Sequence, residues 1–240
     1  MPENNPITSS DSPVTSDKET REQKKARLIA EQDQRITSDL GDVEVYFQTL
    51  DSDPEIKPLL AKSGTNATVI ADGKAKLKVA QAGFTDRQLS MGAEAAANTD
   101  ASTRHEEEHK AYADFREIVR ARLTSPAARQ ALGVVGTVPK DREKLIAVAR
   151  GGYEAAKSEP YQSALADSGY DLAGLTERLA ALDVFADILS NQQKAAGAAT
   201  LATQTRNAAM KELRDWMSSQ RRVAKVAFRT RPDLKRKLGL

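Results

Sequence analysis

The stretch from Asp171 to Phe228 constrains the fold more than any other part of the chain. It consists largely of helix-forming residues, contains no proline and has only two glycines, Gly174 and Gly197. Within a helix a glycine costs about 1 kcal/mol relative to alanine, and a proline about 3 kcal/mol. The stretch therefore predicts one long helix or a helical hairpin, and it indicates an all-α protein.

Composition supports helices that approach one another closely. The 240 residues are 40% hydrophobic but only 5% aromatic, and alanine supplies much of the apolar content. A formal net charge of +2 is too small to indicate a partner by itself. The chain has no cysteine, which excludes disulfides, thiolate nucleophiles and zinc–sulfur sites. No cofactor is expected.

The N-terminal segment, residues 1–16, is rich in Ser, Thr, Pro and Asn and is expected to be a disordered tail. It has neither a basic start nor an apolar core, so it does not resemble a secretory signal. No run of apolar residues is long enough to span a membrane. A cytoplasmic protein is expected.

The first half of the chain shows helical periodicity. A stripe with spacings of three, four and seven predicts a helix that ends near Leu50, followed by a short helix from Glu55 to Lys62. From residue 67 to residue 123 the residues are again helix formers, interrupted by three glycines, and one helix or a hairpin would both fit. Residues 134–138 form the best linker, and Pro139 is expected in the first turn of the next helix.

The second half of the chain repeats features of the first half. Sliding the chain by 105 positions pairs Leu60-Ala61 with Leu165-Ala166, and Ser63-Gly64 with Ser168-Gly169. Because turn residues take part in the match, it predicts a tandem duplication, with a first copy over residues 17–133 and a second over residues 139–240. The expected fold is an elongated antiparallel helical bundle in which the two related copies pack together.

The second copy has an apolar stripe that becomes small and polar along its length. The leucines of residues 172–189 are followed at the same spacing by Gln193, Ala196, Thr200 and Thr203. Small residues let helices approach, and polar groups in such a seam fix register and oligomeric state. This pattern favours a coiled-coil-like structural seam in a homo-oligomer; the alternative is a cavity for a small molecule.

One motif has the form of a catalytic site. His105-Glu-Glu-Glu-His109 matches the H-E-x-x-H pattern, in which two imidazoles on one helix face bind zinc and Glu106 acts as general base. Over these five residues the chain resembles the zinc metallopeptidases called zincins. A third ligand would have to be a carboxylate, and the equivalent positions in the second copy are Met210 and Arg214. The alternative is a solvated, charged helix face.

The C-terminal segment carries the clearest charge feature. Residues 214–240 hold nine Lys and Arg residues and two Asp residues. Candidate contacts to phosphate or nucleic acid are Arg221, Arg222, Lys225, Arg229, Arg231, Lys235, Arg236 and Lys237. Leu213, Trp216 and Phe228 follow an apolar stripe in the same segment, so a packed helix with a basic outer face is the alternative.

Taken together, these patterns favour a non-enzymatic structural or scaffolding protein that acts through helix–helix association, with an unidentified protein partner or its own copies. Binding of nucleic acid or phosphate through the basic C-terminal helix is the first alternative. A metal-binding protein or zinc hydrolase at His105, Glu106 and His109 is the second.

Overall fold

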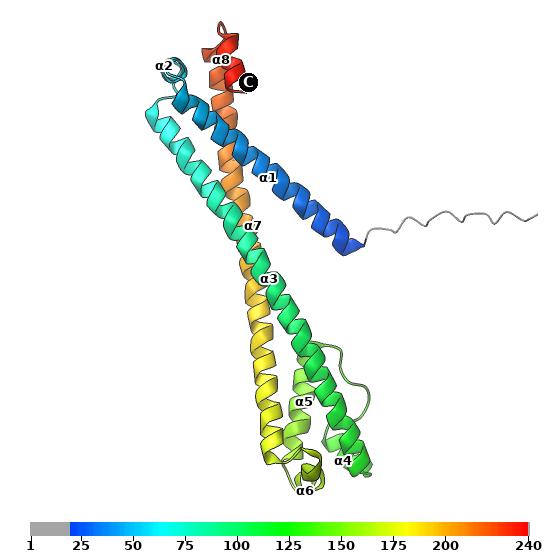
Figure 1. Cartoon of the computed structure of the whole chain (residues 1–240). Coiled ribbons are helices and arrows are strands. Elements are labelled where there is room, and N and C mark those ends of the chain that lie inside the picture. The colour runs from blue at the N-terminus through cyan, green and yellow to red at the C-terminus, as the bar shows by residue number, and fades with distance from the viewer. Residues whose placement is uncertain (1–19, 240) are drawn as a thin grey trace, which may run out of the picture. The chain divides into compact units, whose positions relative to one another are not determined.

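The computed structural model describes residues 20–239, and every regular element in that range is a helix (Figure 1). The elements are α1 (Arg21–Ser52), α2 (Ile56–Lys62), α3 (Ala67–Arg122), α4 (Pro126–Ala131), α5 (Arg142–Ala156), α6 (Tyr161–Leu165), the 3₁₀ helix η1 (Ala166–Ser168), α7 (Leu172–Ala227) and α8 (Pro232–Lys237). The all-α prediction is confirmed for this range. The expected tail, residues 1–16, lies outside it.

The helix ends follow local chemistry. The Thr20 side chain accepts a hydrogen bond from the backbone N–H of Gln23, and the Gln23 side chain accepts one from Thr20, so a capping box begins α1. Pro139 does not begin a helix, contrary to expectation. Instead the Asp141 carboxylate accepts from the backbone N–H of Lys144, and α5 begins at the following residue, Arg142.

The two long helices, α3 and α7, are each continuous over 56 residues. Two glycines within α3 are sites of close packing against α7. A Cβ built on Gly73 would lie 2.2 Å from the Trp216 ring, and one on Gly83 would lie 3.3 Å from the Cα of Arg206. Their missing side chains let α7 approach, and this close packing offsets the cost of glycine in a helix.

The chain forms two compact units, and each unit draws on both halves of the sequence. The terminal unit contains described residues 20–77 and 216–239, and the central unit contains residues 78–215. Within the central unit α3 and α7 run antiparallel, because Gly83 lies against Arg206 whereas Arg104 bonds to Ala181. No helix among residues 20–239 is both long and apolar enough to cross a membrane.

The terminal unit packs α1, α2 and α8 against the beginning of α3 and the end of α7. Its core has an aromatic centre in which the Trp216 ring stacks on Phe47 at 5.3 Å and meets the edge of Tyr46 at 6.2 Å. The Thr65 hydroxyl donates to the side chain of Gln220 inside this core, at 2.6 Å. Other buried members are Leu40, Leu50, Ile56, Leu60, Leu77, Phe228, Leu234 and Leu238.

The central unit packs α5 between the end of α3 and the beginning of α7, with α4, α6 and η1 at one end (Figure 1). Phe115 is the hub of its aromatic cluster, with ring centroids 4.9 Å from Tyr153 and 5.1 Å from Tyr170. The fully buried residues around it include Val119, Leu132, Leu145, Ala149, Leu165, Leu175, Leu182 and Phe185.

The register of the polar seam on α7 differs from the expected one. Beyond Leu189, the side chains turned inward follow 192, 196, 199, 203 and 206, whereas Gln193 and Thr200 are exposed. The steps between these positions alternate between four and three. The step after Leu189 is three, to residue 192, whereas the prediction had a step of four, to Gln193. Leu172, expected at the start of the stripe, is 57% exposed.

Candidate functional site

The H-E-x-x-H motif lies on α3 in the central unit. His105 and His109 are half-buried, and their ring centroids are 5.9 Å apart. The Nε2 atom of His105 is buried without a hydrogen-bond partner, and burial, with the positive charge of Arg142, lowers the pKa of His105. Glu106, the expected base, is exposed.

Within the described part of the chain, no third ligand joins these two histidines. Glu143, Glu154 and Glu177, the carboxylates available for that role, are exposed, and Glu154 pairs with Lys157. Across residues 20–239 no group of three or more His, Asp or Glu side chains is placed to hold a metal ion. A zinc hydrolase needs three protein ligands and an open position, so this arrangement lacks one ligand.

The buried carboxylate of the motif is Glu108, which lies between Glu106 and His109 and is 3% exposed. Arg104 pairs with it at 2.9 Å and also donates to the carbonyl oxygen of Ala181 on α7. Burial raises the pKa of the Glu108 carboxyl, and the Arg104 charge opposes that shift. The other Glu108 oxygen, Oε2, has no hydrogen-bond partner. This buried ion pair was not predicted from the sequence. The signal for it was the position of Glu108, which lies four residues before Tyr112 and therefore on the same inward face of the helix.

A polar network joins three helices of the central unit. Gln192 on α7 donates to Asn98 on α3 at 2.6 Å and accepts from Arg142 on α5 at 3.0 Å. Arg142 also donates to the Ser102 hydroxyl at 3.0 Å. These contacts fix where the beginning of α5 lies along α3 and α7. The role of the network is therefore structural.

The basic C-terminal segment is divided between packing, ion pairs and exposed cations. Leu213, Trp216 and Phe228 are buried, so the apolar stripe predicted for this helix is confirmed. Arg231 pairs with Glu55 at 2.8 Å and with Asp233 at 2.9 Å. These carboxylates raise the pKa of Arg231.

A second ion pair ties α8 to the turn between α1 and α2. Lys237 contacts Asp53 at 2.7 Å, which raises the pKa of the lysine and lowers the pKa of the aspartate. Two of the eight candidate phosphate contacts, Arg231 and Lys237, therefore form ion pairs within the terminal unit. The other six are exposed or, for Lys235, half-exposed: Arg221, Arg222, Lys225, Arg229, Lys235 and Arg236.

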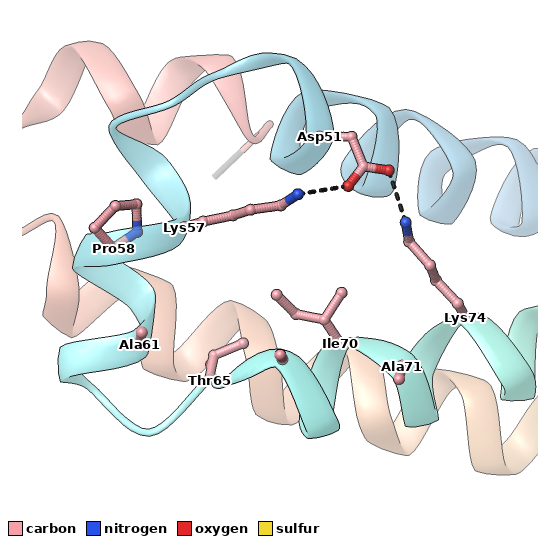
Figure 2. Close-up of a pocket in the computed structure, with 9 residues that line it drawn as sticks. Asp51, Lys57, Pro58, Ala61, Thr65, Ile70, Ala71 and Lys74 are labelled. Carbon is pink, nitrogen blue, oxygen red and sulfur yellow. Dashed lines mark hydrogen bonds and ion pairs between the residues drawn. The ribbon is translucent and has the colours of Figure 1, made fainter.

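The terminal unit also contains a pocket of about 500 Å³ that no sequence pattern indicated (Figure 2). It lies where the end of α1, α2 and the beginning of α3 meet. The Asp51 carboxylate stands at its edge and pairs with Lys57 at 2.8 Å and with Lys74 at 2.7 Å. The rest of its lining is apolar apart from Thr65, and consists of Pro58, Ala61, Ala67, Ile70 and Ala71.

Comparison of the chain with protein-family models, with curated proteins and with solved structures found no match in any of the three.

Proposed function

We propose that the protein is a non-enzymatic structural protein that acts through helix–helix association and self-associates through α3 and α7. The observation that carries this proposal is the spacing of the inward side chains on α3. One series of buried and half-buried side chains on this helix occupies positions 77, 80, 84, 87, 91, 94, 101, 105, 108, 112, 115 and 119, and further positions such as 97, 104 and 116 are also buried or half-buried. Apart from one missing position between 94 and 101, the steps alternate between three and four, which is the heptad pattern of a coiled coil.

A tandem duplication is part of this proposal, and the element bounds support it. The helices α3 and α7 have the same length, and they begin at Ala67 and Leu172, which are 105 positions apart. Glycines with positive φ recur after equivalent helices, with φ of 98° at Gly64 and 83° at Gly169. Only glycine adopts such a conformation readily, so the sequence match and the backbone match support the same duplication.

The two units are built from equivalent helices of the two copies, which also supports the duplication. In the terminal unit α1 and α2 of the first copy pack with α3 and with the end of α7. In the central unit α5 and α6 of the second copy pack with α7 and with the end of α3. Each copy thus contributes its first helices to one unit and the end of its long helix to the other.

We place the self-association surface in the part of the central unit where α3 and α7 pack together without α5. The contacts of Arg142 place the beginning of α5 beside Ser102 and Gln192. Beyond that level, toward lower numbers on α3, Leu89 is 67% exposed, and Leu201 on α7 is 63% exposed. A helix pair buries one stripe per helix, and a further helix layer would cover these leucines.

Light scattering coupled to size-exclusion chromatography tests the proposal on the full chain. We expect a stable oligomer, and we expect Leu89→Lys combined with Leu201→Lys to shift the protein toward the monomer. The matched control is Val184→Lys, another exposed aliphatic side chain of α7, at 51% exposure, that lies in the three-helix part. A monomeric wild-type protein at micromolar concentration would refute the proposal.

Nucleic-acid binding is the second candidate, because Arg221, Arg222 and Lys225 on α7, and Arg229 in the turn after it, are exposed without a described ion pair. Contacts to phosphates release counterions, so binding to DNA or RNA should weaken steeply between 50 and 200 mM salt. A charge-reversed variant, Arg221→Glu with Arg222→Glu, should then lose binding. Binding that does not respond to salt would exclude this candidate.

A further inference from the structure

The pocket of the terminal unit combines an apolar lining with two cations at one edge. Ile70 points into the hollow in Figure 2, and the side chains of Lys57 and Lys74 extend toward Asp51 at its edge. Ala61 and Ala71 also line the pocket. Its volume of about 500 Å³ lies within the range of small-molecule sites, which is roughly 300 to 1,000 Å³. Such sites are mostly apolar with a few polar groups that orient the ligand.

The charges at the edge favour an anion. Lys57 and Lys74 each donate to a different oxygen of Asp51, so the three side chains carry a net positive charge. Each ammonium has three N–H donors and uses one on Asp51, which leaves donors for a second acceptor. The two lysine side chains are each 45% exposed, so a ligand can reach them from solvent.

Two positions of the central unit that correspond to the pocket carry larger, buried side chains. At a distance of 105 positions, Thr65 and Lys74 correspond to Tyr170 and Leu179, which are both buried. The hydrogen bond from Thr65 to Gln220 corresponds to the ring contact between Tyr170 and Phe115. This comparison rests on the proposed duplication, whereas the pocket itself does not. It shows that larger side chains can occupy these two positions of the helical framework.

We propose that this pocket binds a small amphipathic anion, which is a carboxylate on an aliphatic body. The aliphatic body lies on Pro58, Ile70 and Ala71, and the carboxylate accepts hydrogen bonds from Lys57 and Lys74. Burial of the aliphatic body supplies the affinity, and the two ammonium groups select the charge.

The proposal is tested by titrating the full-length protein with octanoate in a calorimeter, with 1-octanol and octylamine as probes of the same length. We expect one saturable site per chain for octanoate, weaker binding of 1-octanol and no binding of octylamine. The absence of saturable octanoate binding would overturn the proposal. Equal affinity for octanoate and 1-octanol would remove the role of the lysines and overturn it as well.

Substitutions of the charged residues at the edge of the pocket should change the affinity for octanoate in opposite directions. Lys57→Gln and Lys74→Leu, which introduce the residues found 105 positions later, should each weaken octanoate binding about tenfold. Asp51→Asn should strengthen it, because the repulsion of the ligand carboxylate is removed. Lys62→Leu, which removes an exposed charge of α2 outside the pocket, should leave it unchanged.

These results are independent of the oligomeric state, which is measured separately by light scattering. A monomer that binds octanoate would refute self-association alone, and an oligomer that does not bind it would refute the ligand site alone. If Lys62→Leu weakens binding as much as Lys74→Leu does, the effect is one of net charge and the assigned site is wrong.

Discussion

The contact between Gly73 and Trp216 gives the sharpest test of how α3 and α7 pack in the terminal unit. Replacing Gly73 with alanine would place a Cβ 2.2 Å from Cζ2 of the tryptophan ring. Non-bonded carbons prefer separations of about 3.5 to 4.0 Å, so the ring would have to move by more than 1 Å. The ring is 8% exposed and packs on Phe47 and Tyr46, which leaves little room to move.

The expected magnitude combines two opposing effects. Overpacking of a core costs about 1 to 3 kcal/mol, and more where neighbours cannot move. Alanine gains about 1 kcal/mol over glycine in a helix. With a clash this close and a ring held on two sides, the overpacking cost wins. We expect Gly73→Ala to lower the free energy of unfolding by about 1 to 2 kcal/mol.

Urea unfolding followed by tryptophan fluorescence measures this effect, because Trp216 is the only tryptophan in the chain and lies in the contact itself. The matched control is Gly41→Ala, in α1 of the same unit, where an added Cβ meets nothing within 4 Å. That change should stabilise the protein by up to about 1 kcal/mol.

A double variant separates the clash from any general effect of alanine. In a Trp216→Leu background, followed by circular dichroism, Gly73→Ala should lose most of its cost, since the aromatic ring is absent. If Gly73→Ala is as stable as the wild-type protein, or more stable, the close approach of α7 to α3 at this position is refuted.

Three further outcomes are expected. The raised pKa of Glu108 means that the unfolded chain ionises first, so wild-type stability relative to Glu108→Gln should fall as the pH rises from about 4 to about 7 in urea unfolding; a difference that does not change with pH would contradict the burial of this carboxyl. Thr65→Val should destabilise the terminal unit by about 1 to 2 kcal/mol in the fluorescence assay, because it leaves Gln220 without its donor; an unchanged midpoint would exclude this hydrogen bond. After incubation with zinc and removal of excess metal with a chelator, native mass spectrometry should show no retained ion, since His105 and His109 lack a third ligand; one zinc per chain, lost in His105→Ala, would contradict this and revive the metal site.

The sequence alone determined the helices and many of their ends. Apolar spacing of three and four residues and the scarcity of proline select helix locally. Turn residues such as Ser63-Gly64 and Ser168-Gly169 end the short helices where expected, because glycine adopts positive φ at little cost. These signals act over a few residues, so they can be read without knowledge of the fold. The burial of Leu213, Trp216 and Phe228 was predictable for the same reason.

Tertiary structure decided how those helices are used. Whether α3 would break at Gly73 or Gly83 depended on the approach of α7, which local propensity does not encode. The beginning of α5 depended on the Asp141 cap rather than on Pro139. The register of α7 beyond Leu189 depended on which face met α3, because polar and small residues specify a face weakly.

The candidate sites show the same division between local and long-range information. The H-E-x-x-H pattern located two histidines but not the missing third ligand, because coordination depends on residues that are distant in the chain. Nor did the sequence show that Arg231 pairs with Glu55, 176 positions away. The pocket around Asp51 likewise is formed by residues of three helices: the end of α1, α2 and the beginning of α3. Local sequence sets where helices form, and long-range packing sets which of their side chains meet.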